Sequence, residues 1–143
     1  MYDNIFIGGA EVVQDEAWLR KNKIGLIVKC ESDTDIVHPS IPTFHFPLID
    51  TIIHPNARKP VMASIEKLTD MIKAVASSDM GILIHCRAGQ NRSALVIGTF
   101  LCKHRGLGYE EIKSLLDAAN KKRGTVALWN ISFRAMLKDF CDS

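Results

Sequence analysis

One stretch of nine residues combines a thiol, a glycine and two guanidinium groups between two apolar segments. It reads His85-Cys86-Arg87-Ala88-Gly89-Gln90-Asn91-Arg92-Ser93. The residues before it pattern as a buried strand and those after it as a buried helix, so we expect a tight loop between them. Such a loop turns backbone N–H groups inward and receives the positive end of the helix dipole, and it therefore binds anions. The chemistry that this arrangement predicts is attack of a thiolate on a phosphorus atom.

Three side-chain types within this stretch suit phosphate chemistry individually. Gly89 lets the backbone bend or approach a ligand where a Cβ atom would obstruct it. Arg92 offers a planar fork of donors that holds two phosphate oxygens together. Cys86 lies in a field of amide dipoles and positive charge, which favours the reactive thiolate form. We therefore expect Cys86 to be the nucleophile and Arg92 the main side-chain ligand of the phosphate.

The pattern of apolar residues predicts the elements that position this loop. Strands are expected over residues 5–7, 24–29, 43–46 and 82–84. Helices are expected over residues 11–22, from Pro60 onward, and over 93–103, 109–121 and 130–140, with an irregular loop over 50–59. This order predicts an α/β fold with a small, mostly parallel central sheet and helices on both faces. In such sheets ligands bind outside the carboxyl ends of the strands, which is where the nine residues lie.

Composition narrows the class of protein further. The 143 residues suit a single domain, and 47% of them are apolar, enough for a core. The net charge of +2 is too small to indicate bulk nucleic-acid binding. No window approaches the ~18 uninterrupted apolar residues of a membrane span, and the first residues do not resemble a signal peptide. We expect a protein of the cytoplasm or nucleus, with no membrane partner and no strong nucleic-acid signal.

The cysteines predict thiol chemistry without a metal. The chain has four of them, at wide and irregular spacing, and no C-x-x-C pair of the kind that binds zinc. A reducing compartment would keep them as thiols, so that one can act as a thiolate. We expect no metal and no cofactor.

The nine-residue stretch resembles the signature of the protein tyrosine phosphatases. The fixed positions of the pattern H-C-x-x-G-x-x-R-[S/T] are filled by His85, Cys86, Gly89, Arg92 and Ser93. The small size of the chain resembles the dual-specificity branch of this superfamily. Residues 2–30 resemble the opening strand, helix and strand of that branch, and the segment from Asn130 resembles its closing helix. The resemblance implies hydrolysis of phosphomonoesters through a phosphocysteine, on phosphotyrosine and also on phosphoserine or phosphothreonine of proteins.

The resemblance also implies a role for each position. Cys86 would attack phosphorus, and Ser93 would hydrogen-bond its sulfur and help it leave in the second step. His85 would support the loop from behind. The phosphate would be held by Arg87, Ala88, Gly89, Gln90, Asn91 and Arg92.

The general acid of this family is an aspartate on a loop that follows a strand, upstream of the cysteine. Asp50 has that placement. Its alternative interpretation is a solvated loop residue. The other upstream aspartates fit less well, because they lie a strand earlier, inside the long helix or in its exit turn: Asp33, Asp35, Asp70 and Asp79. Proton donation to the leaving oxygen is worth about 10²–10⁴ in rate.

Cys30 ends the second expected strand, beside the loop. A few relatives carry a cysteine at a comparable place, where it forms a reversible disulfide with the nucleophile. The resemblance therefore makes Cys30 a candidate redox partner of Cys86. The alternative is a buried apolar cysteine.

Other functions stay open at this point. Arg87 in the loop is similar to basic residues of relatives that act on phosphoinositides, and Asn91-Arg92 is similar to relatives that act on RNA 5′-phosphates. A non-catalytic phosphate-binding module is a further alternative. A phosphorylated protein remains the expected substrate.

Overall fold

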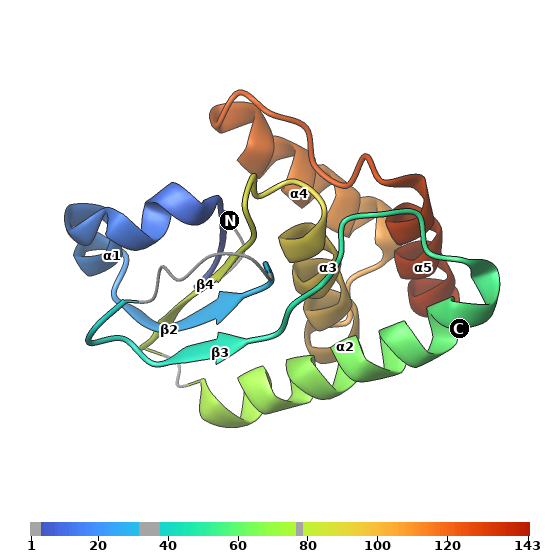
Figure 1. The fold of residues 1–143 in the computed structure, drawn as a ribbon, viewed down its shortest axis with the longest axis horizontal. Coiled ribbons are helices and arrows are strands. Elements are labelled where there is room, and N and C mark those ends of the chain that lie inside the picture. The colour runs from blue at the N-terminus through green and yellow to red at the C-terminus, as the bar shows by residue number, and fades with distance from the viewer. Residues whose placement is uncertain (1–3, 32–37, 77–78) are drawn as a thin grey trace.

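The computed structural model describes residues 4–31, 38–76 and 79–143, and it is built around one parallel sheet (Figure 1). Its four strands are β1 (Ile5–Gly8), β2 (Ile24–Lys29), β3 (Thr43–His45) and β4 (Gly81–His85). They lie in the order β1-β4-β2-β3, and each neighbouring pair is parallel. The expected α/β fold with a mostly parallel sheet is confirmed.

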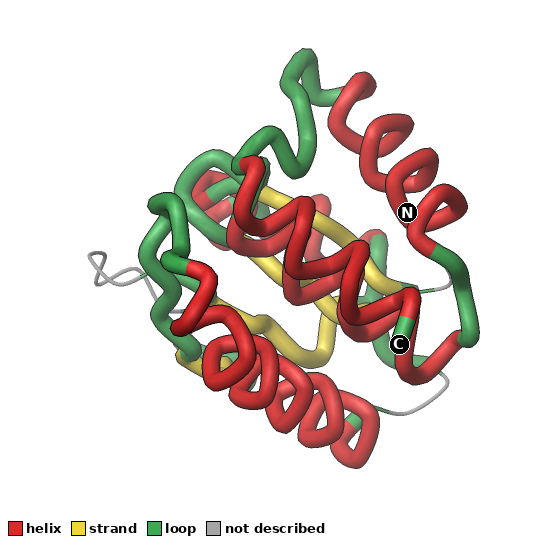
Figure 2. Tube along the Cα trace, turned by 90° about the vertical axis from the view of Figure 1, so that its right-hand side faces the viewer, coloured by secondary structure: helices red, strands yellow, loops and turns green. Residues whose placement is uncertain are grey.

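Helices cover both faces of the sheet, as Figures 1 and 2 show. They are the 3₁₀ helix η1 (Ala10–Gln14) and the α-helices α1 (Glu16–Lys21), α2 (Pro55–Val75), α3 (Arg92–Arg105), α4 (Tyr109–Lys122) and α5 (Ile131–Asp142). On one face, Val13 and Leu19 pack with Ile27 and Leu83 in a small core. The larger core on the other face is closed by α2–α5. Among them α3 contacts α2, α4 and α5, and residues 93–101 are all buried, as its all-round apolar pattern predicts.

The first helical segment differs from the expected single helix over 11–22. It consists of η1 and α1, which are separated at Asp15. The side chain of Asp15 accepts a hydrogen bond from the Trp18 backbone N–H at 3.1 Å, so it caps α1. A side chain that caps one helix ends the preceding one, and this is the physical reason for the break.

The start of α2 also corrects the sequence-based expectation. The helix begins at Pro55 and not at Pro60, so only the first part of the expected loop over 50–59 is irregular. His54 is its N-cap, and Nδ1 of that ring accepts from the Asn56 N–H at 3.1 Å. Both prolines suit a first helical position. Pro60 lies inside the helix, where it gives up one hydrogen bond near the N-terminal end.

The strand register brings three chain segments to one edge of the sheet. His85 at the end of β4 pairs with Gly8 of β1 on one side and with Lys29 of β2 on the other. The segments that start at Gly9, Cys30 and Cys86 therefore leave the sheet side by side. Within the described ranges, no helix is long and apolar enough to cross a bilayer.

Candidate active site

The loop between β4 and α3 is held from outside through its backbone carbonyl groups. The carbonyl of Arg87 accepts from the Ala10 N–H at 3.1 Å, and that of Gln90 accepts from the Leu128 N–H at 2.8 Å. These contacts come from opposite ends of the chain, one from η1 and one from the segment between α4 and α5. They fix the loop at two points.

Two side chains near the end of α4 hold the middle of the same loop. Arg123 donates from Nη2 to the Ala88 carbonyl and from Nη1 to the Gly89 carbonyl, both at 2.9 Å. Asn120 Nδ2 also donates to the Gly89 carbonyl at 2.9 Å. Four consecutive carbonyl groups, 87–90, are thus bound on the outside of the loop. No pattern in the sequence indicates this role of Arg123, because its acceptors are backbone carbonyl groups.

The opposite side of the loop presents backbone N–H groups. Within the part of the chain that the structure describes, the amides of residues 88–91 donate to no backbone carbonyl. Gly89 makes this path feasible, with φ +66°. A Cβ atom there would lie 2.7 Å from the Gly8 carbonyl carbon and 2.5 Å from Arg123 Nη2. The result is a concave ring of donors at the N-terminus of α3, which is an anion site.

Cys86 is the first residue of this loop, directly after β4. It is buried, and its Sγ atom is 3.3 Å from the hydroxyl oxygen of Ser93, which is buried in the first turn of α3. The serine hydroxyl is therefore placed to donate to a cysteine thiolate. The expected pairing of Cys86 and Ser93 is present in the geometry.

Arg92 has one donor that the protein leaves without a partner. Its Nη1 donates to the Leu48 carbonyl at 3.3 Å. Its Nε is buried and has no hydrogen-bond partner among the described residues. A buried donor without a partner costs about 1–3 kcal/mol. A bound anion would supply the missing acceptor.

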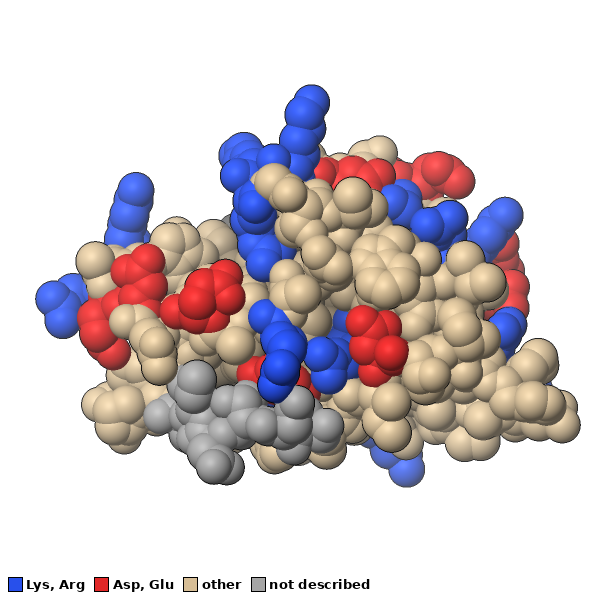
Figure 3. Space-filling view, turned by 45° about the horizontal axis from the view of Figure 1, so that its top comes forward, with Lys and Arg blue, Asp and Glu red and all other residues tan. Residues whose placement is uncertain are grey.

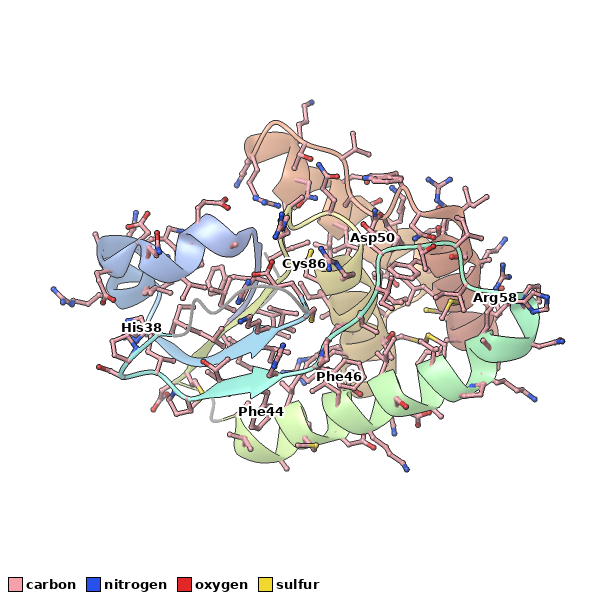
Figure 4. All side chains as sticks on the ribbon, viewed as in Figure 1. His38, Phe44, Phe46, Asp50, Arg58 and Cys86 are labelled. Atoms are coloured by element: carbon pink, nitrogen blue, oxygen red, sulfur yellow. The ribbon has the colours of Figure 1, made fainter. Side chains whose placement is uncertain are left out.

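Asp50 is attached to the same loop by two asparagines. Its Oδ2 accepts from Asn91 Nδ2, and its Oδ1 accepts from Asn130 Nδ2, both at 3.0 Å. Asp50 is exposed, whereas Asn91 and Asn130 are buried. Figure 4 shows Asp50 on the segment that passes above α3, on the side where Cys86 lies. A carboxyl group is thus held at the rim of the anion site, while the alternatives Asp33 and Asp35 lie outside the described residues.

Asn130 belongs to the site, although sequence reasoning noted it only as the start of the closing helix. It is the N-cap of α5, where its Oδ1 accepts from the N–H groups of Ser132 and Phe133 at 3.0 and 3.1 Å. Its own N–H donates to Asn91 Oδ1 at 2.9 Å. A polar residue before an apolar helical run signals an N-cap. Nothing in the sequence indicates that its amide reaches an aspartate 80 positions away.

His85 lies behind the loop, at the end of β4, and is almost fully buried. Burial lowers the pKa of His85 to about 4, and the nearby charge of Lys29 acts in the same direction. Its Nδ1 is 3.9 Å from Glu31 Oε1, too far for a hydrogen bond. Neither ring nitrogen makes a hydrogen bond of ordinary geometry with the described residues. The ring is thus packed behind the loop in a buried position that disfavours its charged form.

Cys30 lies between the nucleophile strand and the segment that carries Asp50. Its N–H donates to the His85 carbonyl at 2.8 Å, and its carbonyl accepts from the Leu48 N–H at 3.1 Å. Burial raises the pKa of the Cys30 thiol far above its usual range; Cys86 adds to this effect and Arg92 opposes it. Both cysteines are free thiols in this structure. The effect of Cys86 and Arg92 on this pKa indicates that the Cys30 thiol lies near the nucleophile, as the sequence predicts.

The rim of the loop also carries an indole. Trp129 Nε1 donates to Gln90 Oε1 at 2.7 Å, and Gln90 Nε2 donates to the Thr125 hydroxyl.

No group of three His, Cys, Asp or Glu side chains is placed to hold a metal ion in the described part of the chain. The site can thus bind an oxyanion, attack it with sulfur and exchange a proton with it.

Comparison with known families agrees with this geometry. The model of the dual specificity phosphatase catalytic domain matches residues 5–143. The chain belongs to this family, a branch of the cysteine-based protein tyrosine phosphatases.

Individual relatives are distant. Dual specificity protein phosphatase 14 of Mus musculus is 27% identical over 142 residues, which cover 96% of this chain and 65% of the relative. Dual specificity protein phosphatase 16 of Homo sapiens is 24% identical over 137 residues, 96% of this chain and 20% of the relative. This chain thus spans between a fifth and two thirds of the length of these curated relatives.

Solved structures share the fold. Human DUSP28 superposes with a TM-score of 0.82 at 22% identity, covering 98% of this chain and 92% of that one. DUSP15 superposes with a TM-score of 0.80 at 21% identity, covering 97% and 83%. The arrangement of one parallel sheet and its helices is therefore that of dual specificity phosphatases.

Proposed function

We propose that this protein hydrolyses phosphomonoesters through a phosphocysteine formed on Cys86, without a metal or cofactor. The principal substrate in this proposal is phosphotyrosine on proteins, with phosphoserine and phosphothreonine as further substrates. The observation that carries the proposal is the buried Arg92 Nε without a partner, beside the Cys86–Ser93 pair. An anion bound at the loop would supply an acceptor for this donor.

In the first step the Cys86 sulfur attacks phosphorus as the bond from phosphorus to the ester oxygen breaks. The equatorial oxygens accept from Arg92 and from the backbone amides of residues 87–92. These donors face the charge that develops in the transition state, where such preorganised groups are most effective. Asp50 gives its proton to the leaving oxygen.

Asp50 has to change partners during this step. Both of its oxygens accept hydrogen bonds, one from Asn91 and one from Asn130. To act as an acid it must hold a proton on one oxygen and turn it toward the substrate. The amides then orient the carboxyl group through the other oxygen.

In the second step a water molecule attacks the phosphocysteine. Asp50, now ionised, takes a proton from this water, and the sulfur–phosphorus bond breaks. The Ser93 hydroxyl donates to the departing Cys86 sulfur and stabilises it as a thiolate. The four cysteines are free thiols, which fits the reducing cytoplasm or nucleus that this chemistry needs.

The proposal is tested by turnover of p-nitrophenyl phosphate in EDTA and reductant, with wild type beside Cys86→Ser. We expect metal-independent activity that the substitution abolishes, while inorganic phosphate or tungstate still binds to the variant. A folded wild type that binds phosphate but turns over no aryl phosphate would instead indicate a phosphate-binding module. A panel of tyrosine and serine phosphopeptides, phosphoinositides and RNA 5′-phosphates then ranks the substrates.

A further inference from the structure

Exposed apolar side chains gather around the candidate active site. Large hydrophobic residues with 49–70% exposure occur at seven described positions. Five of these lie in the two segments that border the phosphate-binding loop: Ile49, Ile52, Val126, Trp129 and Ile131. The other two, Met71 and Val75, lie on α2. A concentration of exposed apolar side chains in neighbouring segments is typical of an interaction site.

Positive charge gathers in the same place. We call segments 46–59, 86–93 and 121–134 the active-site face. They contain eight of the 18 Lys and Arg residues but only one of the 16 Asp and Glu residues, Asp50. The remainder of the chain holds ten basic and fifteen acidic residues. The small net charge of +2 is therefore the sum of a positive active-site face and a negative remainder. Figure 3 shows a broad area of uncharged residues (tan) on this side, bordered by blue groups and also by red ones.

Hydrogen bonds hold the backbone of the two segments that carry these apolar side chains. Arg58 Nε donates to the Ile53 carbonyl at 3.1 Å, and Arg134 Nε donates to the Leu128 carbonyl at 3.2 Å. The bond between Asp50 and Asn130 joins the two segments to each other. The same bonds place two guanidinium groups beside these segments.

We propose that the active-site face docks on an anionic lipid bilayer. A surface that combines aliphatic side chains, a tryptophan and flanking Lys and Arg residues has the composition of peripheral membrane-binding surfaces. The apolar groups enter the boundary between head groups and acyl chains, and the basic groups meet the anionic head groups. A bilayer offers both acyl chains and anionic head groups, so exposed aliphatic side chains beside basic residues fit it better than they fit an acidic peptide, which offers charge alone. This docking is peripheral and needs no membrane-spanning helix, but it departs from the sequence-based expectation of no membrane partner.

Docking in this orientation would turn the phosphate-binding loop toward the bilayer. Phosphomonoesters presented at the membrane surface would then be favoured over the same groups in solution. This consequence rests on the proposed function, whereas binding to the bilayer does not.

The experiment measures co-sedimentation of the Cys86→Ser protein with vesicles, so that no turnover is needed. Vesicles of phosphatidylcholine alone are compared with vesicles that also contain phosphatidylserine, at low and high salt. Val126→Ser combined with Ile131→Ser removes apolar groups from the face. Met71→Ser combined with Val75→Ser is the matched control, because these residues are equally apolar and exposed but lie on α2. Lys121→Ala with Lys122→Ala tests the charge, with Lys67→Ala and Lys73→Ala as its control on α2.

We expect binding to the anionic vesicles that weakens with salt. The Val126/Ile131 variant should bind about tenfold or more weakly, and each lysine removed from the face should cost about fivefold. Both α2 controls should bind like the parent. In a Trp18→Phe background, the fluorescence of Trp129 should shift to the blue on binding.

Three outcomes would overturn the proposal. One is no binding to either kind of vesicle. Another is binding that the Val126/Ile131 variant retains in full, which would mean charge alone acts. The third is evidence that the face binds something other than a bilayer. A dimer that the Val126/Ile131 variant dissociates would show that a second copy binds there. A lower kcat/KM of this variant on a soluble phosphopeptide, without vesicle binding by the parent, would show that a protein substrate binds there. Activity on p-nitrophenyl phosphate, measured separately with Cys86 intact, reports on the proposed function.

Discussion

Asn130 donates from Nδ2 to Asp50 Oδ1 at 3.0 Å and at the same time caps α5 through its Oδ1. One side chain therefore links the orientation of the candidate acid to the start of the last helix. The two tasks use different atoms, so substitutions can separate them.

Asn130→Ser should separate these tasks because serine caps helices well but cannot reach Asp50 with an amide. We expect a loss of stability of about 1–2 kcal/mol, because the hydrogen bonds from Nδ2 to Asp50 and to the Thr51 carbonyl are lost, with lower kcat on phenyl phosphate and nearly unchanged KM. Asn130→Ala should lose the cap as well, at a cost of about 1 kcal/mol. Thermal unfolding and steady-state kinetics of both variants provide the measurement. Equal kinetics of Asn130→Ser and wild type on phenyl phosphate would show that the contact does not orient the acid.

Asp50→Ala should depend on the leaving group. Phenolate is a poor leaving group and needs a proton, so turnover of phenyl phosphate should fall by about 10²–10⁴. The better leaving group of p-nitrophenyl phosphate should show a much smaller loss. Asp70, which pairs with Lys103 on the far side of the core, supplies the control Asp70→Ala. If Asp50→Ala and Asp70→Ala behave alike on both substrates, another group is the acid.

The neutral state of His85 predicts a pH dependence of stability. The pKa of His85 is about 4 in the folded protein, against 6.5 for an ordinary histidine. Above pH 6.5 His85 is mostly neutral in both the folded and the unfolded chain, so its titration does not lower the free energy of unfolding. Between pH 6.5 and 4 the unfolded chain binds a proton that the folded one does not. The free energy of unfolding should fall by about 3 kcal/mol across this window.

Denaturant unfolding at pH 7 and at pH 4.5 measures this effect. His85→Gln has no titrating ring, so its loss of stability between the two pH values should be smaller than that of wild type by about 2–3 kcal/mol. Equal losses in the two proteins would mean that His85 is protonated in the fold.

The position of Cys30 beside the nucleophile predicts that Cys30 protects Cys86 reversibly against oxidation. Hydrogen peroxide should oxidise the Cys86 thiolate to a sulfenic acid, which the Cys30 thiol then converts to a disulfide with loss of water. Peptide mapping should find the Cys30–Cys86 crosslink, and dithiothreitol should restore activity. Cys30→Ser should lose activity irreversibly under the same treatment, and Cys102→Ser should behave like wild type. If no crosslink forms in the oxidised wild type, Cys30 is a buried apolar cysteine.

The sequence indicates those residues of the candidate site that lie close together along the chain. Cys86, Gly89, Arg92 and Ser93 lie within one short loop, so their types and spacing almost define its geometry. The sequence predicts the four strands at nearly their observed bounds, because β1, β2 and β4 are short apolar runs and β3 lies between Pro42 and Pro47. The parallel arrangement followed from the alternation of strands and helices.

The parts that the sequence could not predict depend on contacts between distant segments. Arg123 binds carbonyl groups at positions 88 and 89, and backbone acceptors leave no trace in residue types. The start of α2 was misplaced because Pro55 and Pro60 both suit a first helical residue, and the choice depends on the cap from His54. The excess of Lys and Arg over Asp and Glu on the active-site face is also not evident from the sequence, because three separate segments contribute to it.

The most direct test of the account is to trap the phosphorylated enzyme. Ser93→Ala removes the donor to the Cys86 sulfur, at a cost of about 1.5–3 kcal/mol or roughly 10- to 100-fold in the second step. Rapid acid quench of this variant with p-nitrophenyl phosphate, followed by peptide mass spectrometry, should find one phosphoryl group on the peptide that contains Cys86, after a burst of p-nitrophenol. Turnover without a burst and without phosphate on Cys86 would contradict the account.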